Sequence, residues 1–147
     1  MKKDGEVDWR SLEQFSFGDS RELADELVGL VLVGKKRATC WAASEGPKTR
    51  VGKRWVVRDG SGVPIVVIET VELTQRRFGE VDEAFAFDEG EDDRTLASWR
   101  RAHQNYFRRQ GTFAPDMLLF CERFRLVARI NANASLRSHE PNNSLRR

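Results

Sequence analysis

The sequence contains no apolar run of the roughly 20 residues that a membrane-spanning helix needs. Its first ten residues, MKKDGEVDWR, are polar and lack the apolar core of a secretion signal. Cysteine is scarce as well, because only Cys40 and Cys121 are present, and both lie in apolar segments typical of strands. We therefore expect a cytoplasmic protein without a membrane partner, whose two cysteines are reduced and buried.

Histidine is equally rare, and the net charge is small. His103 and His139 are isolated in the sequence, which argues against a zinc site or a catalytic triad. His103 falls on the apolar side of a predicted helix and is interpreted as a core residue. A net charge of +2 over 147 residues does not indicate a nucleic-acid partner by itself. We expect one domain over residues 1–130, a polar tail over 131–147, and no cofactor or metal.

The charges are distributed unevenly along the chain. Residues 80–93 carry eight acids and no base, without the ligand spacing of a calcium loop, and are interpreted as a solvated loop with helix caps. Arg94, Arg101 and Arg108 recur every seven residues in a segment of helical periodicity, 94–109, and would share one face. That face is either an ordinary solvated surface or a stripe that contacts phosphate groups.

Periodicity and turn signals predict the remaining elements. Asp19 or Ser20 can cap a helix that ends at Gly34, where a left-handed residue is expected. Strands are predicted over residues 37–43, 54–58, 63–74 and 117–129, and the turn DGSG joins the second to the third. The order of helix, three strands, helices and strand predicts an α+β fold with helices packed on a small curled sheet.

One short segment carries a family resemblance. GKKRAT, residues 34–39, matches the Gly-x-Lys-x-x-Thr signature of the ASCH domain family, a group of PUA-like proteins. The chain resembles larger bacterial members in ordered blocks from Phe17 to Val127. This resemblance implies a small, mostly antiparallel β-barrel with flanking α-helices and a cleft beside the signature. It also implies a nucleoside or single-stranded RNA as the binding partner.

The resemblance further implies an activity. Small ASCH proteins with a similar signature are amidohydrolases that act on N4-acetylcytidine with a lysine, a threonine and a glutamate, and other members are described as ribonucleases. The matching positions are Lys36, Thr39 and Glu89, with Asp88 and Glu91 as neighbouring choices for the carboxylate. The alternative is an RNA-binding regulatory module that uses the same basic cleft without catalysis.

The chemistry of these residue types leaves one question open. A threonine hydroxyl needs a base to become a nucleophile. Lys36 could be that base only if its pKa were lowered from ~10.4 toward ~7–8. Lys35 and Arg37 would lower this pKa, whereas Glu89 would raise it. A lysine that stays charged would instead stabilise an oxyanion or hold a phosphate.

Trp41 completes the candidate site. In a strand it projects to the same side as Thr39, where it either packs in the core or offers a surface for a stacked base. Lys35 and Arg37 are expected to contact a nucleoside or nucleic acid beside it. Simpler interpretations are a helix-end charge for Lys36 and a plain strand residue for Thr39. We expect residues 36–43 to enter a central barrel strand that lines the cleft.

Overall fold

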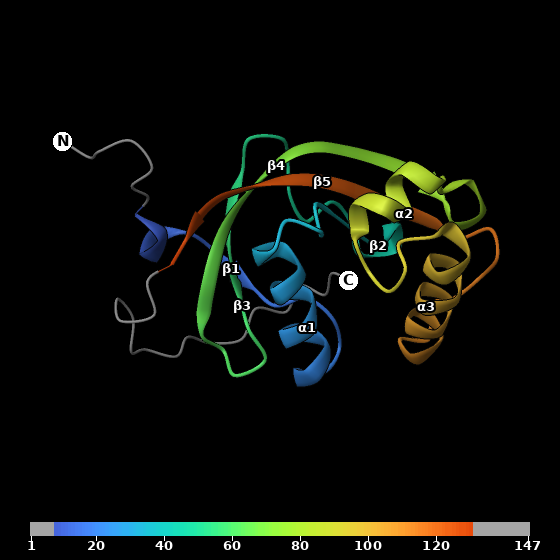
Figure 1. Cartoon of the computed structure of the whole chain (residues 1–147). Coiled ribbons are helices and arrows are strands. Elements are labelled where there is room, and N and C mark those ends of the chain that lie inside the picture. Colours follow the sequence, from blue (N-terminus) through green and yellow to red (C-terminus); the bar gives the residue numbers. More distant parts are fainter. Residues whose placement is uncertain (1–7, 131–147) are drawn as a thin grey trace.

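Residues 8–130 are described by the computed structural model, and within them five strands form one sheet on which three α-helices pack (Figure 1). The predicted tail, residues 131–147, lies outside this range. No helix in the described range is long and apolar enough to cross a membrane. The strands are β1 (Gln14–Phe15), β2 (Ala38–Ala42), β3 (Arg54–Arg58), β4 (Pro64–Arg77) and β5 (Leu118–Arg129). The helices are α1 (Arg21–Leu32), α2 (Glu83–Glu89) and α3 (Leu96–Arg109).

The strand order is β1-β3-β4-β5-β2, and every neighbouring pair is antiparallel except the parallel pair β1 and β3. The α+β class is therefore confirmed, but the expected closed barrel is wrong. The sheet is open, and β1 and β2 are its two edges. β1 is only two residues long, which is too short for the ladder that would close a barrel.

Register shifts bend the long central strands. The pairing of β4 with β5 shifts between Val67 and Ile68 and again between Thr70 and Glu72. Such irregularities increase the local twist of a sheet. In Figure 1 the two strands accordingly arch across the molecule, with α1 inside the curve and α2 and α3 at one end.

Helix α1 begins and ends where the sequence predicts. The hydroxyl of Ser20 accepts a hydrogen bond from the Leu23 amide at its start. At its end Gly34 has a φ of 81°, and its amide bonds to the Val31 carbonyl. The chain then enters β2, but β2 is an edge strand beside β5 and not the central strand that we expected.

The acidic segment differs from its interpretation as a loop. It contains α2, which is capped by the Asp82 side chain and buries Phe85, Ala86 and Glu89. Gly90 ends the helix in a left-handed conformation, and a Cβ at this position would collide with the Lys35 carbonyl. Glycine at this position therefore lets the end of α2 pack directly on the signature segment.

The two faces of the sheet support separate apolar clusters. Ala38 and Cys40 of β2 pack with Leu119 and Cys121 of β5 against α2 and α3. The other cluster places α1 against β1, β3, β4 and Phe124 of β5. Because side chains alternate along a strand, Thr39 projects from the face opposite to Cys40. The site residues of β2 are thus divided between two faces of the sheet.

Candidate functional site

Of the three basic side chains in the signature segment, only that of Lys36 points into the protein. Lys35 and Arg37 are exposed, whereas Lys36 is 1% exposed. Backbone hydrogen bonds fix this arrangement, because the Arg37 amide donates to the Asp88 carbonyl at 2.6 Å and the Arg37 carbonyl accepts from the Phe124 amide at 3.0 Å. The short connection between α1 and β2 is thereby held to α2 on one side and β5 on the other.

Lys36 is the centre of a buried ion cluster. Its Nζ lies 3.0 Å from Glu89 Oε1 and 3.1 Å from Glu91 Oε2, and it is 3.4 Å from the Glu89 carbonyl oxygen. The side chains of Lys36 and Glu89 have no exposed surface, and that of Glu91 is 4% exposed. The structure therefore brings together two of the three residues indicated by the family resemblance, which are 53 positions apart in the sequence.

The second oxygen of Glu89 faces α3. Trp99 Nε1 donates to Glu89 Oε2 at 2.8 Å, and His103 Nε2 lies 3.1 Å from the same oxygen. The rings of Trp99 and His103 stack with centroids 4.1 Å apart. The contacts of Trp99 and His103 with Glu89 were not predicted from the sequence. The spacing of four between these two residues, which places them on one face of a helix beside the acidic segment, is the signal that could have indicated these contacts.

The electrostatics of the cluster show whether Lys36 is charged or neutral. Burial alone lowers the pKa of Lys36, but the charges of Glu89 and Glu91 and their hydrogen bonds outweigh burial and raise it. Burial alone raises the pKa of Glu89, whereas Lys36, His103 and the Trp99 hydrogen bond lower it well below its ordinary range. Near neutral pH Lys36 is thus a cation that cannot take a proton from a hydroxyl group.

Cys40 lies beside this cluster. Burial, followed by the negative charge of Glu89, raises the pKa of the Cys40 thiol well above its ordinary value. Burial likewise raises the pKa of Cys121, its cross-strand partner, to about 12. Both cysteines are free and buried, as expected from the sequence.

The lowered pKa of Glu89 predicts a dependence of stability on pH. A carboxyl group whose pKa is lower in the folded state contributes stability above its unfolded pKa, here about 4.5, and loses it as the pH falls toward the folded pKa. We expect the free energy of unfolding, measured by urea titration, to decrease below pH ~4.5 with a contribution from Glu89 of up to about 1.4 kcal/mol per pH unit. Glu89→Gln should remove that contribution. The matched control is Glu83→Gln, an exposed position of the same helix, and equal pH slopes in the two variants would contradict the assignment.

Thr39 lies opposite a different polar network. It is fully buried and lies directly opposite Glu122 in the pairing of β2 with β5. Thr70 donates to Glu122 Oε2 at 2.6 Å, and the Thr49 and Thr70 hydroxyls are 2.8 Å apart. Since the Thr70 proton is used toward Glu122, Thr49 must donate to Thr70, and Trp55 Nε1 in turn donates to Thr49 at 2.9 Å. These successive hydrogen bonds, from Trp55 through Thr49 and Thr70, therefore end at the buried carboxylate of Glu122, which lies opposite Thr39.

Glu122 is the carboxylate that sequence analysis missed. It lies within FCERF, where it has the appearance of an alternating strand residue. Only the pairing of β2 with β5 shows that it is the cross-strand neighbour of Thr39. Directly opposed residues have Cβ atoms about 4.5–5.5 Å apart, so the carboxylate is within reach of the Thr39 side chain.

Trp41 is part of the core. It is 1% exposed, stacks on Phe120 with ring centroids 5.8 Å apart, and donates from Nε1 to the Gly46 carbonyl at 2.8 Å. This environment agrees with its simpler interpretation as a packing residue. Stacking of a base on the Trp41 ring would first require its displacement from Phe120.

The expected arginine stripe is not continuous. Arg94 precedes α3, has a φ of 65°, and donates to the carbonyls of Phe87 and Lys35. Helix α3 starts only at Leu96, after the cap Thr95, so Arg94 does not share a helical face with the other two arginines. Arg101 and Arg108 do lie seven residues apart on α3, and both are exposed.

Two surface pockets lie away from the buried clusters. The larger, about 640 Å³, is formed by α1 and α3, and the smaller, about 440 Å³, lies beside the end of β2. Neither is lined by Lys36, Thr39 or Glu89. The larger is lined by Asp19, Ser20, Glu22, Leu23, Glu26, Asp92, Ala102, Asn105 and Arg109.

The open, curled sheet with one helix inside its curve and two at its end is the architecture of a PUA-like α+β domain. The chain matches the ASCH domain model over residues 13–128 and belongs to the ASCH domain family. The family resemblance seen in the signature segment is thereby confirmed. No functionally curated protein matches the chain.

Solved structures agree with this assignment. An ASCH domain from Lactobacillus crispatus JV V101 is 36% identical, with 81% of each chain covered and a TM-score of 0.74. Protein EF3133 from Enterococcus faecalis V583 is 29% identical over 87% of this chain and 86% of that one, with a TM-score of 0.73. An ASCH protein from Zymomonas mobilis shares the fold at 11% identity, covering 71% of this chain and 64% of its own, with a TM-score of 0.52.

Proposed function

We propose that this ASCH domain protein binds a nucleoside or single-stranded RNA and hydrolyses the amide of an N4-acylated cytosine nucleoside such as N4-acetylcytidine. The observation that carries the proposal is the position of Thr39, a hydroxyl of the family signature, directly opposite the buried carboxylate of Glu122. A hydroxyl with a carboxylate in reach has the two groups that acyl transfer needs first, a nucleophile and a base.

The reaction can be written with these two groups. Thr39 Oγ1 attacks the acyl carbonyl carbon while its proton passes to the Glu122 carboxylate. The bond from the carbonyl carbon to N4 then breaks, and N4 leaves as the free amine with the proton from Glu122. Water next attacks the carbonyl carbon of the acyl-threonine while one of its protons passes to the Glu122 carboxylate. The bond from that carbon to Thr39 Oγ1 then breaks, Glu122 returns the proton to Oγ1, and the carboxylic acid is released. Because both side chains are buried, a nucleoside reaches them only after a local movement of the protein.

Lys36 and Glu89 have a supporting role in this scheme. Both side chains are fully buried, and each keeps the other charged. The pair attaches the start of β2 to α2, and so positions Thr39 three residues further along the strand.

The direct test is incubation of the purified full chain with N4-acetylcytidine and chromatographic detection of cytidine and acetate. Release of both products that increases with protein concentration would support the proposal. Absence of products under conditions in which the folded protein binds the nucleoside would refute hydrolysis and leave a binding protein.

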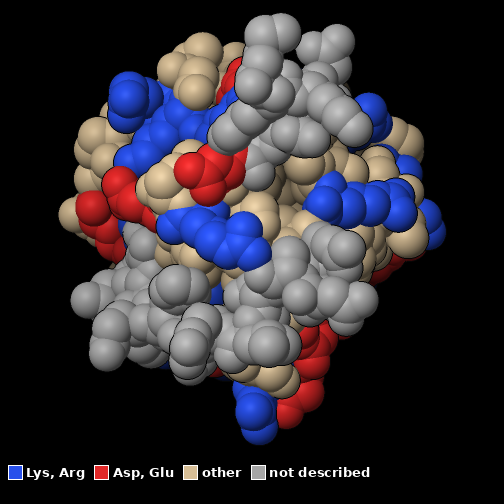
Figure 2. All heavy atoms as spheres, turned by 90° about the vertical axis from the view of Figure 1, so that its left-hand side faces the viewer, with Lys and Arg blue, Asp and Glu red and all other residues tan. Residues whose placement is uncertain are grey.

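A non-catalytic RNA-binding module is the second candidate, and two exposed arginines on α3 favour it. On the face shown in Figure 2, Lys and Arg side chains form several groups, and Asp and Glu side chains lie beside some of them. Arg54 and Arg125 both contact Glu69, so their charges are partly compensated. Arg101 and Arg108, in contrast, are exposed on α3 and could contact phosphate groups.

Salt dependence tests this second candidate. The affinity for a short oligouridylate, measured by fluorescence anisotropy, should decrease with salt, and Arg101→Ala should reduce the logarithmic slope by about one. Arg54→Ala is the matched control, because the Arg54 side chain is already paired with Glu69. An affinity that does not change with salt would identify α3 as an ordinary solvated face.

A further inference from the structure

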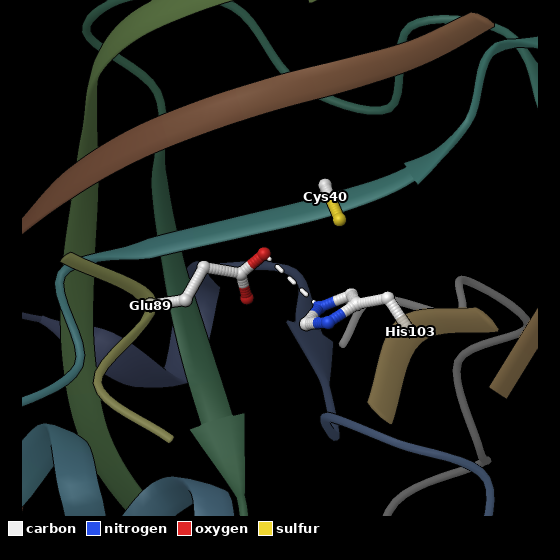
Figure 3. Close-up of side chains that lie close together, drawn as sticks. All are labelled: Cys40, Glu89 and His103. Atoms are coloured by element: carbon white, nitrogen blue, oxygen red, sulfur yellow. Dashed lines mark ion pairs between the residues drawn. The ribbon is translucent and has the colours of Figure 1, made fainter. Parts of the chain in front are cut away.

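Three potential metal ligands meet between β2, α2 and α3. Cys40 Sγ, a carboxylate oxygen of Glu89 and a ring nitrogen of His103 all lie within 4.8 Å of one another, and all three residues are fully buried. Figure 3 shows the three side chains pointing toward a common centre from different elements. Thiolate, carboxylate and imidazole are the ligand types that zinc takes in proteins.

The hydrogen bonds of His103 leave one ring nitrogen for this centre. Nδ1 lies 2.8 Å from the Trp99 carbonyl oxygen, and because a carbonyl only accepts, Nδ1 carries the proton. Nε2 is therefore the ring nitrogen that is left for this centre. Nε2 is buried without a hydrogen-bond partner, although it lies 3.1 Å from Glu89 Oε2. Either a proton on Nε2 or a metal cation between the two atoms accounts for this short separation.

Neighbouring residues orient the candidate ligands, as the hydrogen-bond partners of ligands do in known metal sites. Ligating histidines commonly donate their other ring nitrogen to a backbone carbonyl, as His103 does to Trp99. The carboxylate of Glu89 is fixed by hydrogen bonds from Trp99 and Lys36. The stacked Trp99 ring fixes the plane of the imidazole.

We propose that Cys40, Glu89 and His103 bind a zinc-class divalent ion that joins β2, α2 and α3. The thiolate and imidazole ligands favour Zn²⁺ or Co²⁺ over Mg²⁺ or Ca²⁺, which prefer oxygen ligands. Tetrahedral coordination separates ligand atoms by about 3.3–3.8 Å. Small rotations would reach this geometry, because His103 Nε2 and Glu89 Oε2 are 3.1 Å apart and the three ligand atoms all lie within 4.8 Å of one another. As the metal–sulfur bond forms, the Cys40 thiol releases its proton to solvent.

This site does not include the reacting groups of the proposed hydrolysis, and it shares with that scheme only Glu89, a supporting residue. Cys40 and His103 take no part in that reaction, and Thr39 and Glu122 project from the other face of the sheet. The sequence argued against zinc because its histidines are isolated, but Cys40 and His103 are 63 positions apart and only the fold brings them together.

The test uses the full chain and cobalt as a spectroscopic probe. The protein is unfolded in guanidinium with a chelator, transferred to metal-free denaturant, and refolded with Co²⁺, because a buried site loads as the chain folds. We expect one Co²⁺ per chain, a thiolate-to-cobalt charge-transfer band, and zinc in the untreated protein by mass spectrometry. Cys40→Ser should abolish the band and His103→Gln should weaken binding at least tenfold. The matched control Cys121→Ser, a buried cysteine outside the site, should keep the band.

Two results would overturn the proposal. One is wild-type protein that refolds without stoichiometric metal and shows no charge-transfer band, in which case a proton occupies the position between His103 and Glu89. The other is a band that persists in Cys40→Ser, which would place the cobalt elsewhere. The wild-type measurement decides the matter even if a variant fails to fold.

Discussion

Replacement of Lys36 by methionine is expected to lower the free energy of unfolding by about 3–5 kcal/mol, the cost of removing one partner from a buried ion pair. The substitution keeps the apolar part of the side chain but removes the ammonium group between Glu89 and Glu91. The Glu89 carboxylate then stays buried without its closest cation. Guanidinium titration followed by tryptophan fluorescence measures the change.

The same substitution one residue earlier is the matched control. Lys35 is exposed, so Lys35→Met should change the free energy of unfolding by no more than about 0.5 kcal/mol. Adding Glu89→Gln to Lys36→Met should recover part of the lost stability, because it removes the charge that was left unpaired. A loss below 1 kcal/mol in Lys36→Met would show that the carboxylates are neutralised in another way.

The second large effect concerns turnover. If the proposed reaction occurs, Thr39→Val should reduce the hydrolysis of N4-acetylcytidine by at least about a hundredfold, because valine has the shape of threonine without its hydroxyl. Thr39→Ser should retain part of the activity. Single-turnover rates, measured by chromatography of the released cytidine, compare the variants directly.

The partnership of Thr39 with Glu122 adds a further requirement. Residues that act as one unit are not additive, so Glu122→Gln and the double variant with Thr39→Val should be impaired about as much as Thr39→Val alone. Thermal unfolding of each variant separates loss of activity from loss of fold. Wild-type turnover by a folded Thr39→Val protein would exclude the covalent intermediate.

Local signals explain how much of the fold could be predicted. The cap at Ser20, the glycine at the end of α1 and the turn between β3 and β4 depend on neighbouring residues, and all three are confirmed. The two-residue strand β1 was not predicted, because its pairing with β3 depends on residues about 40 positions away. Whether the sheet closes into a barrel depends on the pairing of such edge strands, so the sequence could not show that the sheet stays open.

In the candidate site, too, some contacts could be predicted from the sequence, whereas others depend on residues that only the fold brings together. The contact of Lys36 with Glu89 was accessible through the family signature, which carries information about distant residues. Helix α2 was not predicted, because its acidic composition resembles that of a solvated loop. Phe85 and Ala86 nevertheless form an apolar face of this helix. Glu122, Cys40 and His103 could not be assigned, because their neighbours are set by strand register and helix packing rather than by sequence spacing.

The attachment of α2 to the signature segment has a consequence for motion. The Arg37 amide bonds to Asp88, Lys36 bonds to Glu89, and Gly90 packs on the Lys35 carbonyl. If α2 detached alone, it would leave the Lys36 ammonium without Glu89 inside the protein, which makes such partial opening costly. The end of α2 and the start of β2 therefore form one cooperative unit, and their amide protons exchange with solvent together in the same rare event.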